Sequence, residues 1–280
     1  MKQHLHFIKY HGLGNDFILV DGINHRVDTE LLQKESAWIC NRNFGIGADG
    51  IIVATESKTC DIKMHIINSD GSIAAMCGNG LRCFAQFCFE QGLIEQEVFS
   101  VETDAGKMVP ALIIKNSEVI AVEVDMGINQ YDSKIMTEKK DVNYKTITFE
   151  GEEIELAIVS MGNPHAVIFR ETLDVNLLDK LGPFLQTHKF FPGGVNVEMV
   201  ISVSSSMLEL IVYERGAGKT LACATGACAA VVAGVDKGYC DRKTTVCLPG
   251  GKLLINWQES DNHIIQIGPT KHVFKGELVL

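Results

Sequence analysis

Two stretches of this chain share one residue pattern, and this repeat limits the possible folds more than any other feature. Residues 61–80, DIKMHIINSDGSIAAMCGNG, align without gaps over residues 207–226, MLELIVYERGAGKTLACATG. In that register the alternating apolar positions coincide, and Cys77 falls on Cys223. A repeated pattern of this kind indicates that one supersecondary unit occurs twice in the fold.

The segments that flank the repeat also match, and in the same order. The Gly-Asn pair at 14–15, in HGLGNDF, corresponds to the pair at 162–163, in SMGNPHAV. Gly-Lys-Met at 106–108 corresponds to Gly-Lys-Leu at 251–253. Because chance matches would rarely keep their order, we infer that the chain consists of two related halves, with a boundary near residue 125.

Each half predicts the same local elements. IKMHIIN (62–68) and LELIVYE (208–214) alternate as half-buried strands do. GLRCFAQFCFEQGL (80–93) and GACAAVVAGVDKG (226–238) are helix-forming runs in which a glycine follows the helical residues. DTELLQKESAWIC (28–40) predicts a capped, amphipathic helix. The sequence therefore predicts a mixed α/β protein of two similar lobes.

The segments between these elements are less regular. VETDAGKMVPALII (101–114), followed by VIAVEVDM (119–126), predicts a pair of strands. NQYDSKIMTEKKDVNY (129–144) is polar and without periodicity, so we interpret it as a connection between domains. The first lobe is expected over 1–124, and the second over 125–268.

The composition is that of a protein with a sizeable core. The chain has 280 residues, of which 46% are hydrophobic and 21% charged. This is too apolar for a disordered chain, and no apolar run is long enough to span a bilayer. Such a length favours one large or two medium domains.

The charge balance and the first residues bear on partners and location. Lysine and arginine total 25 against 35 acidic residues, a formal net charge of −10. Nucleic acid and membrane surfaces are therefore not expected partners, and small molecules are the favoured class. The opening residues, MKQHLHFIKYHGLGNDF, lack the apolar stretch of a secretory signal, so we expect a cytoplasmic protein.

The nine cysteines do not suggest a disulfide framework or a metal centre. Their number is odd, the expected compartment keeps thiols reduced, and no C-x-x-C pair occurs. We therefore expect no metal site. Seven cysteines have no counterpart in the repeat and are interpreted as structural: Cys40, Cys60, Cys83, Cys88, Cys228, Cys240 and Cys247.

The two remaining cysteines lie where a strand and turn give way to a helix. Cys77 precedes Gly-Asn-Gly, and Cys223 precedes Ala-Thr-Gly. Free N–H groups and the positive end of the helix dipole should lower the pKa of a thiol there and offer donors to a carboxylate. A single cysteine before a helix more often packs in a core, but two at matched positions favour a chemical role.

Two such thiols facing each other across a cleft between the lobes could invert a stereocentre. One would remove a proton from one face of a carbon, while the other returned a proton to the opposite face. This chemistry requires neither a metal nor pyridoxal phosphate, so no cofactor is expected.

The motifs together resemble the diaminopimelate epimerase family. They run through nearly the whole chain: HGLGNDF (11–17), INSDGSIAAMCGNGLRCFA (67–85), SMGNPHAV (160–167), GVNVEMV (194–200), YERGAGKTLACATGACAA (213–230) and LPGGKL (248–253). The cysteine turns alone would indicate only the wider group that includes proline racemases and isomerases of the phenazine-biosynthesis type.

The resemblance implies an isomerase that interconverts L,L- and meso-diaminopimelate, in lysine and peptidoglycan synthesis. It implies two pseudo-symmetric α/β lobes, each a mostly antiparallel sheet curled around a central helix, with the active site in the cleft between them. The C-terminal strand, 269–280, is expected to return to the first lobe. Family habit suggests a homodimer.

The resemblance also assigns roles to residues of this chain. Cys77 and Cys223 match the acid/base cysteines, and His165 and Glu214 match residues that assist their proton traffic. Arg215 is expected to hold the carboxylate at the non-reacting end of the substrate. The matching substrate contacts are Asn15, Asn68, Gly78, Asn79, Asn163, Asn196, Glu214, Arg215, Ala224 and Thr225.

Two positions depart from the family pattern. Gly50 stands where many members have glutamine, so no substrate contact is assigned to it. Ala224 stands where glycine is usual, and its methyl group lies where backbone should approach substrate. Alanine can still donate its N–H from ordinary backbone angles, so activity should survive.

Three other functions stay open from the sequence. A racemase or isomerase of the same fold could act on another amino acid. A hydrolase could use one cysteine as a nucleophile, although two matched cysteines fit that chemistry less well. A binding module without activity is the alternative that is not an enzyme.

Overall fold

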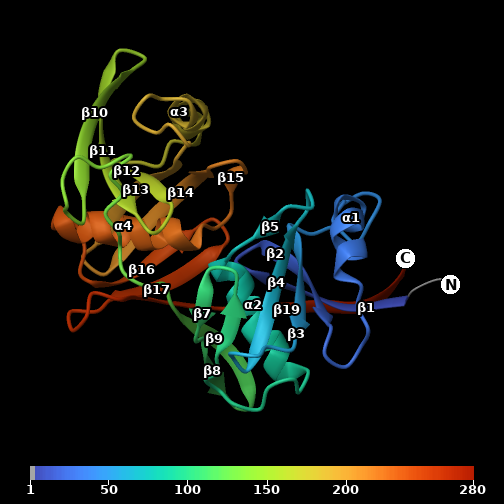
Figure 1. Ribbon diagram of the computed structural model, residues 1–280. Coiled ribbons are helices and arrows are strands. Elements are labelled where there is room, and N and C mark those ends of the chain that lie inside the picture. Colours follow the sequence, from blue (N-terminus) through green and yellow to red (C-terminus); the bar gives the residue numbers. More distant parts are fainter. Residues whose placement is uncertain (1–3) are drawn as a thin grey trace. The chain divides into compact units, whose positions relative to one another are not determined.

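A computed structural model describes residues 4–280 and shows a mixed α/β architecture (Figure 1). The chain divides into two units. Unit 1 extends to Val124 and also takes in Gly268–Leu280, whereas unit 2 is Asp125–Ile267. Within the described residues, no helix is long and apolar enough to cross a membrane.

Unit 1 combines two helices with a sheet and a hairpin. Its elements are β1 (His4–Gly12), β2 (Asn15–Asp21), α1 (Thr29–Ile39), β3 (Gly50–Thr55), β4 (Ile62–Asn68), β5 (Ile73–Ala74), α2 (Gly78–Glu90), β6 (Val101–Thr103), β7 (Gly106–Met108), β8 (Ala111–Lys115), β9 (Glu118–Asp125) and β19 (Lys271–Val279).

The sheet of unit 1 is mostly antiparallel. Its strand order is β19-β1-β2-β3-β4-β6-β7, with β5 beside β4. Only the pairs β2–β3 and β4–β6 are parallel within this described sheet. Helix α2 contacts β1, β2 and β3, and α1 contacts β3 and β4. Because successive strand residues point to opposite faces, β2 and β3 bury side chains against both helices.

Helix α1 shows how the local sequence sets an element boundary. Asp28 caps it, and its side chain accepts the N–H of Leu31 at 3.0 Å. Leu32 and Ile39 then pack with Ile18 of β2 in a buried cluster. Capping and an apolar stripe together give the amphipathic helix expected from the sequence.

Unit 2 follows the same plan. Its elements are β10 (Asn143–Phe149), β11 (Glu152–Ser160), β12 (Pro164–Phe169), α3 (Val175–Gln186), β13 (Asn196–Ser204), β14 (Met207–Glu214), β15 (Gly218–Thr220), α4 (Ala224–Asp236), β16 (Lys243–Leu248), β17 (Gly251–Trp257) and β18 (Ile264–Gly268). The strands follow the order β10-β11-β12-β13-β14-β16-β17-β18, with β15 beside β14.

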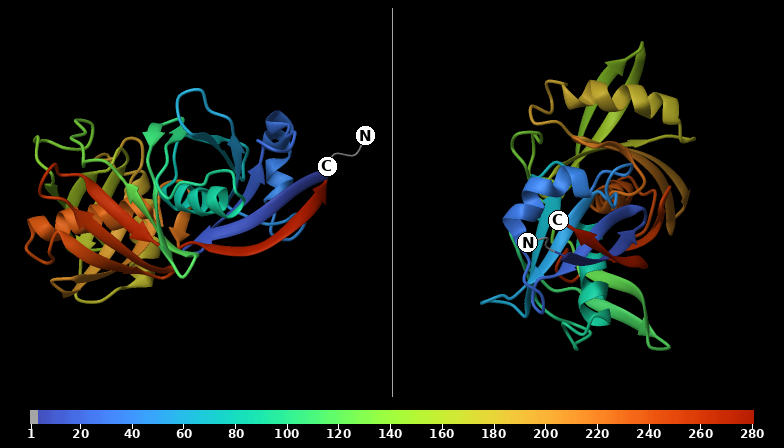
Figure 2. Two further views of the ribbon diagram at one scale, coloured as in Figure 1. Left: turned by 90° about the horizontal axis from the view of Figure 1, so that it is seen from below. Right: turned by 90° about the vertical axis from the view of Figure 1, so that its right-hand side faces the viewer.

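Helix α4 is wrapped by the sheet of unit 2. It contacts β11, β12, β13, β14, β16 and β17, and the right-hand view of Figure 2 shows these strands as an arc around it. The helix is almost entirely alanine, glycine, valine and cysteine, and ten of its residues are buried. Small side chains are needed because the backbone of the helix lies close to its neighbours: a Cβ added to Gly234 would lie 2.7 Å from Sγ of Cys240, in the segment that follows the helix.

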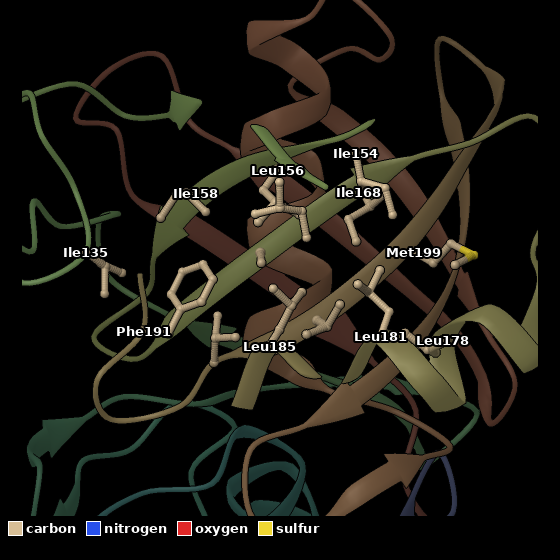
Figure 3. Close-up of a cluster of buried hydrophobic side chains, with 14 of the residues drawn as sticks. Ile135, Ile154, Leu156, Ile158, Ile168, Leu178, Leu181, Leu185, Phe191 and Met199 are labelled. Atoms are coloured by element: carbon tan, nitrogen blue, oxygen red, sulfur yellow. The ribbon is translucent and has the colours of Figure 1, made fainter. Parts of the chain in front are cut away.

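The outer face of the same sheet packs against α3. Leu178, Leu181 and Leu185 of this helix meet Ile168 and Met199 of β12 and β13 (Figure 3). Residues of β12 and β13 therefore face α3 at alternate positions, and the positions between them face α4. This alternation decides which side chains reach the start of α4.

The two units repeat one topology over more of the chain than the aligned segments. In each, an antiparallel pair is followed by a helix, a parallel strand, an antiparallel strand, a short strand, a buried helix and a final hairpin. Gly14 and Gly162 both have φ of 88° at the first turn. At one edge β19, from the end of the chain, takes in unit 1 the place that β10 has in unit 2. The predicted α/β class and the internal repeat are confirmed.

One of the expected local elements was wrong, and a second is more buried than expected. Residues 101–114 form three short strands, β6, β7 and β8, with Pro110 ahead of the third, instead of one long strand. The segment 129–144 is not a simple connection, because Ile135 and Met136 are 4% and 3% exposed and belong to the core against α3. Two buried side chains in a polar run produce no periodic signal.

Candidate active site

The two matched cysteines cap the two buried helices in the same way. Cys77 is the N-cap of α2, and Cys223 is the N-cap of α4. Both have extended backbone angles, and each Sγ accepts an N–H, from Gly80 at 3.4 Å and from Gly226 at 3.3 Å. Each thiol is thereby held at the positive end of a 13-residue helix.

A Cβ on the glycine that bonds each thiol would meet close neighbours, and these differ between the units. A Cβ on Gly80 would lie 3.1 Å from Ile52 Cδ1, a flexible apolar tip. A Cβ on Gly226 would lie 2.6 Å from Glu198 Oε1. The same turn is therefore backed by hydrocarbon in unit 1 and by a carboxylate in unit 2.

In unit 1 the site residues gather around Asn15. Its Oδ1 lies 3.6 Å from Cys77 Sγ and accepts the Asn79 amide at 3.2 Å. Its Nδ2 donates to Asp49 Oδ2 at 2.7 Å. Asp49 in turn accepts from Arg42 at 2.7 Å. An ionised carboxylate thus fixes which end of the Asn15 amide faces the thiol.

A buried cation lies beneath the same turn. Arg82 is fully buried on α2 and donates to Asn79 Oδ1 at 2.7 Å. Gly78, the first residue of α2, is buried, whereas Asn68 at the end of β4 bonds Ser72 Oγ at 2.9 Å. Asn68 is thus the last residue of the strand that precedes the turn, and its amide bonds within that turn segment.

In unit 2 the corresponding residues gather around His165. This imidazole is fully buried, its Nδ1 lies 2.7 Å from Glu198 Oε1, and its Nε2 lies 3.0 Å from Asn163 Oδ1. Asn163 Nδ2 donates to Thr225 Oγ1 at 3.3 Å, and that hydroxyl is 3.5 Å from Cys223 Sγ. A continuous series of contacts therefore joins Glu198 to the thiol.

Glu214 also interacts with the same thiol. It ends β14, and Thr220 of β15 donates to its carboxylate at 2.5 Å. Burial raises the pKa of Glu214 above its usual range, against hydrogen bonds from Thr220 and Cys223 that lower it. Glu214 is therefore a carboxyl group that gains a proton more readily than an exposed glutamate.

Cys223 does not have the lowered pKa expected for a thiol at a helix start. It is 4% exposed, and burial raises its pKa well above the usual value, with further increases from Glu214 and Glu198. The hydrogen bonds from Thr225 and Gly226 oppose this rise without overcoming it. Desolvation outweighs the helix dipole here, so the thiol is the stable form of Cys223.

Asn196 and Arg215 form one arrangement at the edge of unit 2. Asn196 is 4% exposed, donates to Pro164 O at 3.0 Å and accepts the Arg215 N–H at 3.0 Å. Its amide thus holds two strands together. The exposed Arg215 side chain donates to Gly193 O at 3.3 Å and packs on Gly194, which has φ of 75°.

Both departures from the family pattern fit their surroundings. Ala224 is the first helical residue of α4, so its N–H points out of the helix start with ordinary angles. A Cβ at Gly50 would lie 2.7 Å from Ile67 O, so the backbone of β4 leaves no space for a side chain there.

Sequence reasoning missed Glu198, Asp49 and Arg82. The signal for Glu198 was an acidic residue inside an apolar strand, GVNVEMV, where burial demands a partner. Asp49 had no such signal, because the residue that it orients is 34 positions away. Among residues 4–280, no three His, Cys, Asp or Glu side chains group so as to hold a metal ion, and all nine cysteines, which lie in that range, are free thiols.

Comparison with known proteins gives matches over nearly the whole chain. The sequence model of the family described as diaminopimelate epimerase matches residues 7–131 and 157–273. The diaminopimelate epimerase of Methanococcus maripaludis strain C5 is 42% identical over 275 residues, covering 97% of this chain and 99% of the relative. That of Pelotomaculum thermopropionicum is 44% identical over 276 residues, covering 98% of both.

Solved structures match at the level of the fold. A phenazine biosynthesis protein of the PhzF family from Bacillus anthracis has a TM-score of 0.72 at 14% identity, covering 99% of this chain and 100% of that one. A hydroxyproline epimerase from Agrobacterium vitis has a TM-score of 0.69 at 15% identity, covering 100% and 92%. With sequence relatives of this identity and coverage, the chain belongs to the diaminopimelate epimerase family.

Proposed function

We propose that this protein epimerises L,L-diaminopimelate to meso-diaminopimelate, with Cys77 and Cys223 as the two acid/base groups. The observation that carries the proposal is the pair of thiols at equivalent N-caps of α2 and α4, each fixed by the N–H of a glycine three residues on. A one-base enzyme would have no use for the second copy of this arrangement.

The proton transfers follow from the two thiols. One thiolate removes the α-proton, and the opposite thiol delivers a proton to the other face of the same carbon. Because Cys223 is stable as a thiol, it is the proton donor when Cys77 is the base, and their roles exchange in the reverse direction. The N–H groups at the starts of α2 and α4 stabilise the substrate carboxylate as negative charge grows.

We also propose how the substrate is held. Its non-reacting end carries a carboxylate, for which the exposed Arg215 guanidinium is the partner. Asparagine amides and the Glu214 carboxylate supply acceptors for the ammonium groups. The proposed contacts are Asn15, Asn68, Gly78, Asn79, Asn163, Asn196, Glu214, Arg215, Ala224 and Thr225.

The wider arrangement belongs to the same proposal. The lobes 1–124 with 269–280 and 125–268 would face each other across a cleft, bringing the two thiols to opposite faces of one carbon. The product would serve lysine and peptidoglycan synthesis in the cytoplasm, and the enzyme would act as a homodimer. Equilibrium sedimentation of the purified chain tests the dimer directly.

The proposed reaction is tested by supplying L,L-diaminopimelate in deuterated water. We expect meso product with deuterium at the α-carbon, because the proton that leaves goes to one thiol and the new one comes from another. Product without deuterium would exclude the two-thiol mechanism. Since one fold neighbour is a hydroxyproline epimerase, a panel containing proline, hydroxyproline and diaminopimelate tests the substrate, and preference for an imino acid would contradict the proposal.

A further inference from the structure

Glu198 has no role in the proposed chemistry. It lies on β13, and its side chain is buried beside the start of α4. It is fully buried, and its Oε1 bonds His165 Nδ1 at 2.7 Å. Its Oε2 has no hydrogen-bond partner among the described residues. A buried carboxylate with one unpaired oxygen is costly to keep, so an ionised Glu198 is favoured by a positive charge on the imidazole that it contacts.

The imidazole of His165 is placed to carry that charge. Both of its ring nitrogens face oxygen atoms, Glu198 Oε1 at 2.7 Å and Asn163 Oδ1 at 3.0 Å. An imidazole donates from both nitrogens only when it is protonated. With an ionised Glu198, the orientation of the Asn163 amide is therefore the one that matches an imidazolium.

The amide orientation fixes the next two links. With its oxygen toward His165, Asn163 turns its N–H group to Thr225 Oγ1, at 3.3 Å. The hydroxyl proton of Thr225 is then free to point at Cys223 Sγ, 3.5 Å away. A thiolate at Cys223 would thus receive a hydrogen bond.

The opposite protonation state reverses every link. A neutral His165 that donates from Nδ1 to Glu198 accepts at Nε2, so the amide of Asn163 turns over and presents its oxygen to Thr225. The hydroxyl then donates to that oxygen and can only accept from the Cys223 thiol. The direction of these hydrogen bonds therefore depends on the protonation states of both His165 and Cys223.

We propose that Glu198, His165, Asn163 and Thr225 form a hydrogen-bonded chain that couples the charge of His165 to the ionisation of Cys223. The proposal rests on the proposed function and explains how a buried thiol can act as a base in one direction of the reaction. Glu198 is a positioning residue in this scheme: it stabilises the imidazolium and does not touch the substrate.

The coupling is balanced in protons and charge. In one state the Cys223 S–H bond is intact and His165 is neutral. In the other, Sγ has lost its proton to solvent or substrate, and His165 Nε2 has gained one from solvent. With Glu198 ionised in both, the net charge of the three groups is −1 in each state. The chain links two equilibria, and it does not conduct a proton.

Several ionisable groups surround Cys223, and each bears on how a test is interpreted. Glu214 approaches it from β14, whereas Glu198 and His165 approach from β13 and β12. Both carboxylates raise the pKa of Cys223. Simple repulsion therefore predicts that removal of the Glu198 charge makes the thiolate more stable. The hydrogen-bonded chain predicts the opposite, a less stable thiolate.

The test compares the full-length protein with T225V, E198Q and E198Q/T225V. Thiolate at Cys223 is followed by ultraviolet absorbance across pH, as the difference between each protein and the same protein with Cys223→Ala. The conservative variant T225S keeps the hydroxyl, and E153Q removes an exposed carboxylate from β11 of the same unit. Circular dichroism confirms that each variant is folded.

We expect T225V and E198Q each to lower the thiolate fraction about tenfold at a fixed alkaline pH below the midpoint of the parent protein. This corresponds to a shift of about one pH unit in the midpoint, the value of one charge-assisted hydrogen bond. The double variant should be no lower than T225V alone, and T225S and E153Q should match the parent. A higher thiolate fraction in E198Q would overturn the proposal, as would losses that multiply in E198Q/T225V.

This outcome is separable from the proposed function. The absorbance titration contains no diaminopimelate, so a coupled Cys223 in a protein that fails to exchange its α-proton would contradict only the reaction. Normal epimerisation, together with a Cys223 titration that E198Q and T225V leave unchanged, would contradict only the hydrogen-bonded chain.

Discussion

The Cys77 turn and the Cys223 turn have the same backbone and different surroundings. Each thiol caps a 13-residue helix and accepts a glycine N–H. Behind the first, Phe17 and Ile52 lie within 3.5 Å of the position that a Gly80 Cβ would take. Behind the second, the equivalent strand positions carry His165 and Glu198. The two half-sites therefore share one backbone shape, and a few residue differences make their electrostatics unequal.

This inequality suits a two-base reaction. The turns must hold opposite protonation states at any moment, because one thiol donates while the other accepts. Burial and two carboxylates favour the thiol at Cys223. In unit 1, Asn15 and Asn79 face the Cys77 turn with neutral amides, backed by Asp49 and Arg82. Identical environments would give both thiols the same preferred state.

The largest expected effect comes from giving unit 2 the residues of unit 1. H165F alone should destabilise the protein by about 3–5 kcal/mol, because it leaves Glu198 as an uncompensated buried charge. H165F/E198I replaces both groups by hydrocarbon and should recover most of that loss, since a hydrophobic pair can replace a buried ion pair. Chemical denaturation measures both. A double variant as unstable as the single one would show that the two turns cannot be interchanged.

The matched glycines should respond unequally to one added methyl group. G226A places a Cβ 2.6 Å from Glu198 Oε1, and should cost about 1–3 kcal/mol of stability together with most of the activity. G80A meets the movable tip of Ile52 at 3.1 Å, and should cost about 1 kcal/mol or less. Unfolding curves of the two variants make the comparison. Equal losses would mean that the carboxylate does not crowd its turn.

The Asp49 carboxylate should matter through the residue that it orients. D49N weakens the contact that fixes the Asn15 amide and should reduce kcat/KM about tenfold, which is modest because Asp49 is partly exposed. D104N, which alters an exposed carboxylate of the same unit, is the control. Steady-state kinetics with L,L-diaminopimelate give the ratio. Unchanged kinetics in D49N would remove Asp49 from the site.

The smallest effect concerns the pH dependence of stability at Glu214. Because burial raises the pKa of this carboxyl, the folded state holds its proton more tightly than the unfolded chain does. Stability should therefore be present at low pH and fall as the pH rises through the folded-state pKa. E214Q should remove this fall while abolishing activity. Denaturation of both proteins at several pH values tests the sign, and a steeper fall in E214Q would contradict it.

The repeat predicted the fold because both halves adopt the same backbone conformations, and these require similar residues at matching positions. Strand alternation, a capped helix start and small residues on a buried helix are local signals, and they placed both cysteines at N-caps. The burial of Ile135 and Met136 in the segment 129–144 was not predicted, because two apolar side chains in a polar run give no periodic pattern. The pairing of the edge strand β19 with β1 gives no local signal in the sequence, because the two strands lie at opposite ends of the chain.

Within the candidate site, sequence reasoning succeeded where residues lie close to the cysteines along the chain or within a motif. The structure brings Asn15 to Cys77 and joins Asn163 to Thr225, although their substrate contacts stay predictions. The electrostatic differences could not be predicted in this way. The pKa of Cys223 depends on Glu198, 25 positions away in sequence, and on burial that follows only from the packing of α4.

The central claim is that both thiols exchange protons with the substrate. It is tested most directly by α-proton exchange in deuterated water with C77A, C223A and the control C83A, which has an alanine, Ala229, at the equivalent position of unit 2. We predict that C77A and C223A form no deuterated epimer from either L,L- or meso-diaminopimelate, and that C83A retains activity. Formation of the deuterated epimer by C77A or C223A would contradict the account.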